Sequence, residues 1–128
     1  MTADKVVDAS ALAAVLLDET TADAVWTRLR DMRLAAPSLI YFEVTNACLK
    51  KARQFPEKTD IFYAAVERLR RISIQVVEAD FSAVFKLAEQ HGLSAYDASY
   101  LWLALELDAE LVTLDAKLDR AYAAFLRS

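Results

Sequence analysis

Histidine, cysteine and glycine are almost absent from this sequence of 128 residues, which holds one of each: His91, Cys48 and Gly92. A zinc site built from cysteine and histidine needs more of these residues, and one cysteine cannot form a disulfide framework. A single glycine is too few for a glycine-rich phosphate-binding loop. The longest stretches without a charged residue, 9–17 and 34–42, have nine residues each, whereas a helix needs about 20 to span a bilayer. We therefore expect neither a membrane protein nor a structural zinc protein.

Apolar residues are abundant instead. They make up 56% of the chain, against 27% charged residues, which is enough burial to offset the entropy of an ordered chain. The length suits one compact domain, and no repeat, low-complexity segment or linker divides it. We predict a single domain over residues 1–128. No basic leader followed by an apolar run opens the sequence, so we expect a cytoplasmic protein.

Short apolar strands alternate with longer helical patterns along the whole chain. The connections between strands are long enough to hold crossover helices, which parallel strands require. We predict an α/β fold whose parallel sheet is covered by helices on both faces. The expected strands are 5–8, 34–36, 72–77 and 110–113, and the expected helices are about 9–17, 21–33, 38–53, 58–71, 81–91, 94–107 and 116–126.

Four carboxylates differ from the rest of the 19 acidic residues, most of which fall on solvated helix faces. Asp8 and Asp115 each follow a predicted strand, at the end where open α/β sheets place their ligand sites. Glu43 and Asp97 share helix stripes with apolar residues, where a charge is costly unless it is paired or bound to a metal. The strand ends and early helix positions can meet at one rim of a parallel sheet.

Each of these positions also has a purely structural interpretation. Asp8 and Asp115 are good N-caps for the helices that follow them, and Asp97 has the place of the acid in a capping box that begins at Ser94. Glu43 can form a salt bridge with Lys50 or lie on a slightly rotated helix, but no cap explains it. Taken together, four carboxylates without a histidine are the oxygen ligands that Mg²⁺ or Mn²⁺ prefers, and such sites often serve phosphoryl transfer.

Four segments that contain these residues also follow one another in a familiar order. They are Val6-Val-Asp-Ala-Ser10, Phe42-Glu-Val-Thr-Asn46, Leu93-Ser-Ala-Tyr-Asp-Ala98 and Leu111-Val-Thr-Leu-Asp115. The set resembles the PIN-domain nucleases, and most closely the VapC toxins of bacterial toxin–antitoxin pairs. The resemblance covers essentially the whole chain, and it implies a three-layer α/β/α domain with a sheet of four or five short strands.

The resemblance also implies a function. By its analogy, the chain is an endoribonuclease toxin that cleaves tRNA or rRNA with a water activated by Mg²⁺ or Mn²⁺, is neutralised by a cognate antitoxin protein and forms a homodimer. Asp8, Glu43, Asp97 and Asp115 match the acidic quartet that holds one or two metal ions. Ser10, Asn46 and Thr113 match polar neighbours that orient ligands or a water.

The chain departs from the family pattern at two places. Many relatives carry a further acid two positions after the last Asp of the quartet, where this chain has Lys117, so Asp119 is at best an outer substitute. Many relatives also end in one more strand after the last helix. This chain stops at Ser128, which favours a sheet of four strands.

Charge is distributed unevenly along the chain. Residues 50–71 hold seven basic and three acidic residues, although the whole chain has a net charge of −4. We expect Lys50, Lys51 and Arg53 to contact RNA phosphates, and Tyr96, beside Asp97, to contact a base or ribose. An ordinary solvated helix pair explains the basic residues equally well. The alternative for the protein as a whole is a catalytically silent PIN-like interaction module in which the four acids are only caps.

Overall fold

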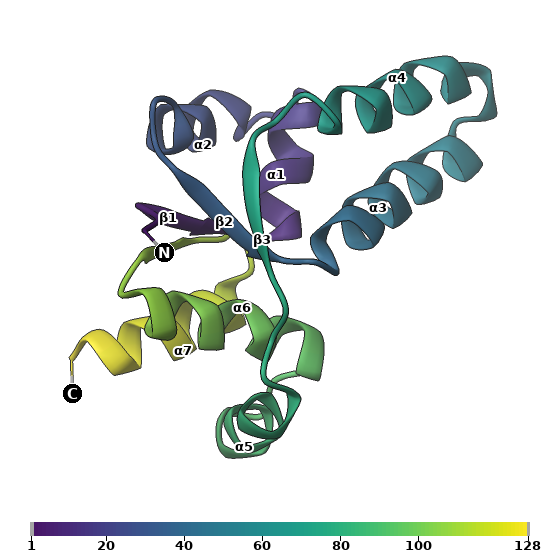
Figure 1. Ribbon diagram of the computed structural model, residues 1–128. Coiled ribbons are helices and arrows are strands. Elements are labelled where there is room, and N and C mark those ends of the chain that lie inside the picture. The colour runs from purple at the N-terminus through teal and green to yellow at the C-terminus, as the bar shows by residue number, and fades with distance from the viewer. Residues whose placement is uncertain (1, 128) are drawn as a thin grey trace.

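The computed structural model describes residues 2–127 and contains one parallel sheet (Figure 1). Its strands are β1 (Lys5–Val7), β2 (Leu34–Pro37), β3 (Ile74–Val77) and β4 (Glu110–Val112). They lie in the order β3-β2-β1-β4, and every neighbouring pair is parallel. The predicted parallel sheet is therefore confirmed. It has four strands within the described residues, so the fifth strand left open by the family pattern is not found there.

Helices cover both faces of the sheet and complete the predicted three-layer domain (Figure 1). One face carries α1 (Ala9–Leu16), α2 (Ala22–Leu29), α3 (Ile40–Gln54) and α4 (Thr59–Leu69), with the short 3₁₀ turn η1 (Pro56–Lys58) joining the last two. The other carries α5 (Phe81–His91), α6 (Ala95–Leu107) and α7 (Ala116–Leu126). No helix among residues 2–127 has the combined length and apolarity that crossing a membrane requires.

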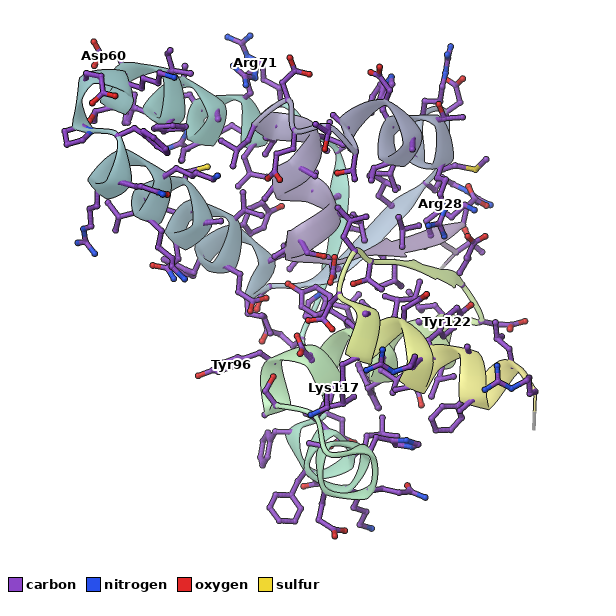
Figure 2. All side chains as sticks on the ribbon, turned by 180° about the vertical axis from the view of Figure 1, so that it is seen from behind. Arg28, Asp60, Arg71, Tyr96, Lys117 and Tyr122 are labelled. Carbon is purple, nitrogen blue, oxygen red and sulfur yellow. The ribbon has the colours of Figure 1, made fainter. Side chains whose placement is uncertain are left out.

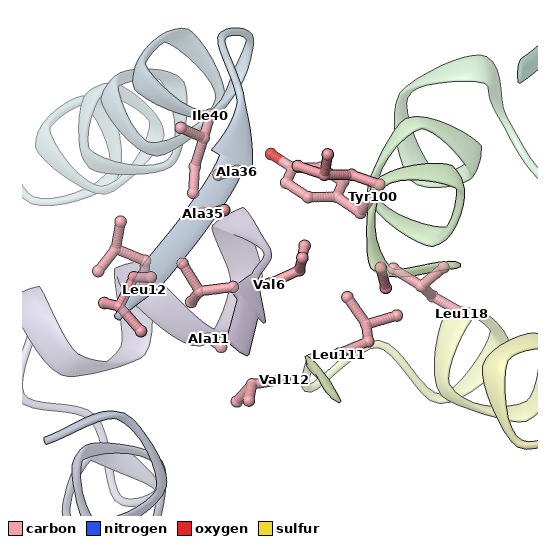
Figure 3. Close-up of a cluster of buried hydrophobic side chains, with 14 of the residues drawn as sticks. Val6, Ala11, Leu12, Ala35, Ala36, Ile40, Tyr100, Leu111, Val112 and Leu118 are labelled. Carbon is pink, nitrogen blue, oxygen red and sulfur yellow. The ribbon is translucent and has the colours of Figure 1, made fainter. Parts of the chain in front are cut away.

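The core lies between these layers, on both sides of the central strands. Val6 and Leu111 are buried in neighbouring strands, and Leu12, Ile40 and Leu118 pack around them from the helices (Figure 3). Successive residues of a strand face opposite sides of the sheet, so a strand that is covered twice must be apolar throughout. This explains the buried pair Val6-Val7 in β1, which ends where Asp8 begins.

Capping residues stand at the ends of several helices in the structure. Asp8, Asp80, Ser94 and Asp115 are N-caps whose side chains accept hydrogen bonds from backbone amides of the first helical turn. Gly92 ends α5 with a φ of 64°, a left-handed conformation that glycine adopts without a Cβ clash. Helix boundaries that depend on such local chemistry are therefore well predicted.

Two boundaries were predicted wrongly. The second helix ends at Leu29 rather than near residue 33, because the chain turns through a left-handed Asp31, with a φ of 64°, to enter β2. Met32 follows Leu29 by three residues, a helical spacing, but it is 43% exposed in that turn. The third strand starts at Ile74 rather than at Ile72, and it is an edge strand, only partly buried.

The parallel sheet places the ends of β1, β2 and β4 at the same edge. Helices α1, α3 and α7 each start at this edge, within a few residues of the preceding strand. Helix α6 packs across β1, β2 and β4 on the opposite face from α3 (Figure 1). This edge therefore collects the first turns of several helices, and these carry the predicted carboxylates.

Candidate active site

Asp8 is the most deeply buried carboxylate of the predicted quartet, with 4% of its surface exposed. Its Oδ1 accepts hydrogen bonds from Ser10 Oγ at 2.7 Å and from the Ala11 amide at 3.0 Å. Its Oδ2 accepts one from Thr113 Oγ1 at 2.5 Å. Burial raises the pKa of Asp8, and these three hydrogen bonds oppose that rise by stabilising the charged form.

The two hydroxyls that hold Asp8 also hold the loop after β4. Ser10 Oγ accepts the Leu114 amide at 3.0 Å, and Thr113 Oγ1 accepts the Asp115 amide at 3.0 Å. Ser10 and Thr113 thus join the end of β1 to the segment that carries Asp115. The predicted role of these two residues as polar neighbours of the quartet agrees with their contacts.

Replacing Thr113 by Val should lower the free energy of unfolding by about 1–3 kcal/mol, because it removes a donor to a buried carboxylate and an acceptor for the Asp115 amide at once. Urea unfolding followed by circular dichroism measures this. Thr45→Val is the matched control, since the Thr45 hydroxyl only donates to the Tyr41 carbonyl within α3. Equal losses in the two variants would contradict the structural role of Thr113.

Glu43 lies half-buried in the first turn of α3, on a different element of the site from Asp8. The Tyr100 hydroxyl, from α6, donates to Glu43 Oε1 at 2.6 Å. Burial raises the pKa of Glu43, the hydrogen bond from Tyr100 lowers it, and the nearby charges of Asp97 and Asp8 raise it further. The salt bridge to Lys50 is not formed within residues 2–127, so that structural interpretation of Glu43 is wrong.

Asp97 and Asp115 lie at the starts of α6 and α7. Asp115 Oδ1 caps α7 by accepting the Leu118 amide at 2.9 Å. The Asp97 amide donates to Ser94 Oγ at 3.0 Å, but the Asp97 carboxylate has no hydrogen-bond donor among the described residues. Half of the capping box is therefore present, and the acid that would complete it is left free for another role.

The charges of Asp8, Asp97 and Asp115 act on one another, and those of Asp97 and Asp8 act on Glu43. Burial raises the pKa of Asp97, and the negative charges of Asp115 and Asp8 raise it further, while the Lys117 ammonium lowers it. The charge of Asp115 likewise raises the pKa of Asp8. Such coupling requires proximity, because exposed charges are screened over distances of roughly 8–10 Å. Residues 8, 43, 97 and 115, far apart in the sequence, thus share one region.

The donor set fits a hard divalent cation. All four groups are carboxylates, and Glu43, Asp97 and Asp115 each keep an oxygen that accepts no hydrogen bond from the described residues. Across residues 2–127, however, no three Asp, Glu, His or Cys side chains form a ready-made ligand group for one metal ion. The carboxylates share a region without converging on a single point, as expected for like charges.

Several predicted residues lie apart from the quartet. Asn46 and Asp119 are exposed, and neither has a hydrogen bond to the four carboxylates in the part of the chain that the structure describes. Lys50, Lys51 and Arg53 lie seven to ten residues beyond Glu43 on α3, which is about 10–15 Å along a helix axis. Tyr96 is 64% exposed at the start of α6, next to Asp97 in the sequence (Figure 2). It therefore lies at the rim of the site.

Tyr100 is the site residue that the sequence did not single out. It is buried in the core, and it follows Asp97 by three residues, so both lie on the same side of α6. The three-residue spacing between Asp97 and Tyr100 was the only feature of the sequence that connected Tyr100 with the site. Aromatic residues in an apolar helix normally pack in the core, and only the position of α3 shows that this hydroxyl meets a carboxylate.

Known proteins are similar to this chain over nearly its whole length. A family model described as the PIN domain matches residues 5–124. Ribonuclease VapC3 from Pyrobaculum aerophilum is 29% identical over 126 residues, which cover 94% of this chain and 96% of that protein. The crystal structure of PAE2754, also from Pyrobaculum aerophilum, is similar with a TM-score of 0.77 and 28% identity, covering 99% of this chain and 95% of that one.

Proposed function

The chain belongs to the PIN-domain family, and we propose that it is a metal-dependent endoribonuclease, the toxin of a toxin–antitoxin pair, with tRNA or rRNA as its substrate. The similarity to a protein named Ribonuclease VapC3 supports RNA cleavage. The observation that carries the proposal is the cluster of Asp8, Glu43, Asp97 and Asp115 at one edge of the sheet, where burial raises the pKa values of the first three and neighbouring carboxylate charges raise them further. Bringing like charges together lowers the stability of the fold, and such arrangements occur mainly at functional sites.

In this proposal Asp8, Asp97 and Asp115 hold Mg²⁺ or Mn²⁺, with Glu43 as a further ligand. When bound, such an ion neutralises charge on a phosphate and lowers the pKa of a water. Ser10 and Thr113 orient Asp8 and fix its distance from the loop that carries Asp115. The Lys117 ammonium, close to Asp97, offers a positive charge to a phosphate at the rim of the site.

The direct test uses purified protein and a mixed pool of tRNA and rRNA. We expect cleavage in Mg²⁺ or Mn²⁺, and none when EDTA removes the ion. Gel electrophoresis of end-labelled RNA shows the fragments. A folded protein that leaves the pool intact under every metal condition would support the silent interaction module instead.

The basic residues at the end of α3 provide a second test. Replacing Lys50, Lys51 and Arg53 together by Ser should weaken RNA binding and reduce the slope of log K against log salt concentration by up to about 2, at roughly 0.7 for each lost contact with single-stranded RNA. Fluorescence anisotropy between 50 and 200 mM salt measures this. The control variant removes three other cations, Lys86, Arg30 and Arg127. Equal slopes in both variants would assign residues 50–53 to solubility or to a partner surface.

Partners provide the remaining test. Expression of the chain alone should arrest bacterial growth, and Asp8→Asn, which keeps the surface and removes the site charge, should not. We expect a small antitoxin protein to relieve the arrest by covering the carboxylates.

We also expect a homodimer, since large apolar side chains such as Phe81 and Phe85 are exposed. Sedimentation of a monomer at high concentration would contradict the dimer alone.

A further inference from the structure

The Tyr100 hydroxyl connects the core of the domain to the candidate site. Only 1% of Tyr100 is exposed, and its ring packs among buried residues of the sheet and of α6. Its oxygen points toward the end of β2 and the start of α3 (Figure 3). A buried phenol needs a hydrogen-bond partner, and here the partner is Glu43 Oε1, at 2.6 Å.

The four carboxylates are held to different degrees. Asp8 is fixed by two hydroxyls and an amide, and Asp115 by the amide of Leu118. The carboxylate of Asp97 accepts no hydrogen bond within residues 2–127. Glu43 has the longest side chain of the four, with the most rotatable bonds, and Tyr100 is its only hydrogen-bond donor among the described residues.

The hydrogen bond from Tyr100 to Glu43 Oε1 determines where Glu43 Oε2 lies. With Oε1 held by a phenol that cannot move in a packed core, the Glu43 side chain is restricted to one orientation. Oε2 is then the oxygen left for the site, and the charges of Asp97 and Asp8 act on this carboxylate. A phenylalanine would fill the same space but would leave Glu43 free to rotate.

We infer that Tyr100 is a positioning residue that fixes Glu43 so that only its Oε2 is presented to the cation and substrate. The inference rests on the proposed function, which it deepens. Tyr100 contacts neither metal nor RNA in this arrangement and acts only through Glu43. It makes one of the long-range hydrogen bonds that assemble the site, together with the Thr113 bond to Asp8 and the bond from the Leu114 amide to Ser10.

The test compares Tyr100→Phe with Tyr122→Phe, whose hydroxyl, on α7, makes no hydrogen bond in the described part of the chain. We expect Tyr100→Phe to lower kcat for a single-stranded RNA by about 10–100-fold and Mn²⁺ affinity by about tenfold, the effect seen when a partner of a metal ligand is removed. KM should not change, because Tyr100 does not touch the substrate. Electron paramagnetic resonance of free Mn²⁺ measures the affinity without any RNA.

A double substitution separates positioning from packing. If Tyr100 acts through Glu43, Glu43→Gln with Tyr100→Phe should bind Mn²⁺ no more weakly than Glu43→Gln alone. If Tyr100→Phe fails to fold, Glu43→Asp replaces it, because the shorter side chain keeps the charge but withdraws from the phenol, and the same losses are expected.

Three results would overturn the inference: wild-type kcat and Mn²⁺ affinity in Tyr100→Phe, a full additional loss in the double variant, or equal losses in Tyr122→Phe. The proposed function fails separately. If the wild-type protein cleaves no RNA but binds Mn²⁺, the affinity measurements alone still decide the role of Tyr100. If it cleaves RNA and Tyr100→Phe does so equally well, the function stands and the positioning role does not.

Discussion

Asp115→Asn should lower RNA cleavage by at least about a hundredfold, whereas Asp80→Asn should leave it unchanged. The two residues are matched, since each is the N-cap of an 11-residue helix, α7 or α5. Asn caps a helix as well as Asp does, so the caps survive in both variants. Only Asp115 shares a region with Asp8 and Asp97, and only there does the substitution remove a charge that a metal ion needs.

This comparison decides between the two interpretations of the strand-end carboxylates. Asp115 is a cap in the structure, as Asp80 is, so capping alone cannot distinguish them. Initial rates on a labelled RNA measure activity, and thermal unfolding verifies that both variants are folded. Because residues of one site act as a unit, Asp8→Asn combined with Asp115→Asn should be barely worse than either alone. Normal activity in Asp115→Asn would favour the silent module.

Asp97→Asn should stabilise the metal-free protein at pH 7.5 while it abolishes cleavage. The carboxylate accepts no hydrogen bond in residues 2–127, and the charges of Asp115 and Asp8 repel it. The side chain is only partly buried, so water screens much of this repulsion and the gain is about 0.5–1 kcal/mol. For a domain of this size, that raises Tm by roughly 2–5 °C. Differential scanning calorimetry in EDTA measures the shift.

Asp23→Asn is the control for this effect. Asp23 also lies in the first turn of a helix, α2, where a negative charge interacts favourably with the helix dipole. Its neutralisation should cost a few tenths of a kcal/mol, opposite in sign to the effect at Asp97. Mn²⁺ should stabilise the wild type by RT ln(1 + [L]/Kd), about 2.7 kcal/mol at a hundredfold excess over Kd, and Asp97→Asn by less. A lower Tm in both variants, unmoved by Mn²⁺, would contradict a shared site.

The same carboxylates determine how stability depends on pH. The folded pKa values of Asp8, Glu43 and Asp97 lie above the unfolded values of about 4. From pH 4 upward, through those raised values, the native state binds more protons than the unfolded state, so in EDTA the wild type should lose stability as pH rises. Asp97→Asn should show a smaller decline between pH 5 and 7.5.

Carboxylates in ion pairs act in the opposite direction and at lower pH. Hydrogen bonds from Arg33 hold the pKa of Asp4 below its ordinary value, and those from Lys5 and Arg28 do the same for Glu110. Their contribution is present above pH 4 and is lost as pH falls through the lowered values. The metal-free protein should therefore be most stable in mildly acidic solution.

Much of the architecture was determined by local sequence. The alternation of apolar strands with helical patterns is sufficient to predict a parallel sheet covered twice, because strands buried on both faces must be apolar throughout. Asp80, Gly92 and Ser94 mark helix ends by chemistry that acts within one turn. The positions of Asp8 and Asp115 after strands predicted the edge of the sheet at which both residues lie, because all parallel strands end there.

Only the tertiary structure decided which partners these residues meet. The sheet order places β1 between β2 and β4. The segment richest in β-branched residues, β3, becomes an edge strand, because strand pairing depends on contacts across the whole chain. Glu43 is 57 residues from Tyr100, and Asp8 is 105 from Thr113, yet each pair shares a hydrogen bond. No local pattern encodes such bonds. They form only when the pairing of β4 with β1 and the packing of α3 and α6 on the sheet bring the donor and the acceptor within 3 Å.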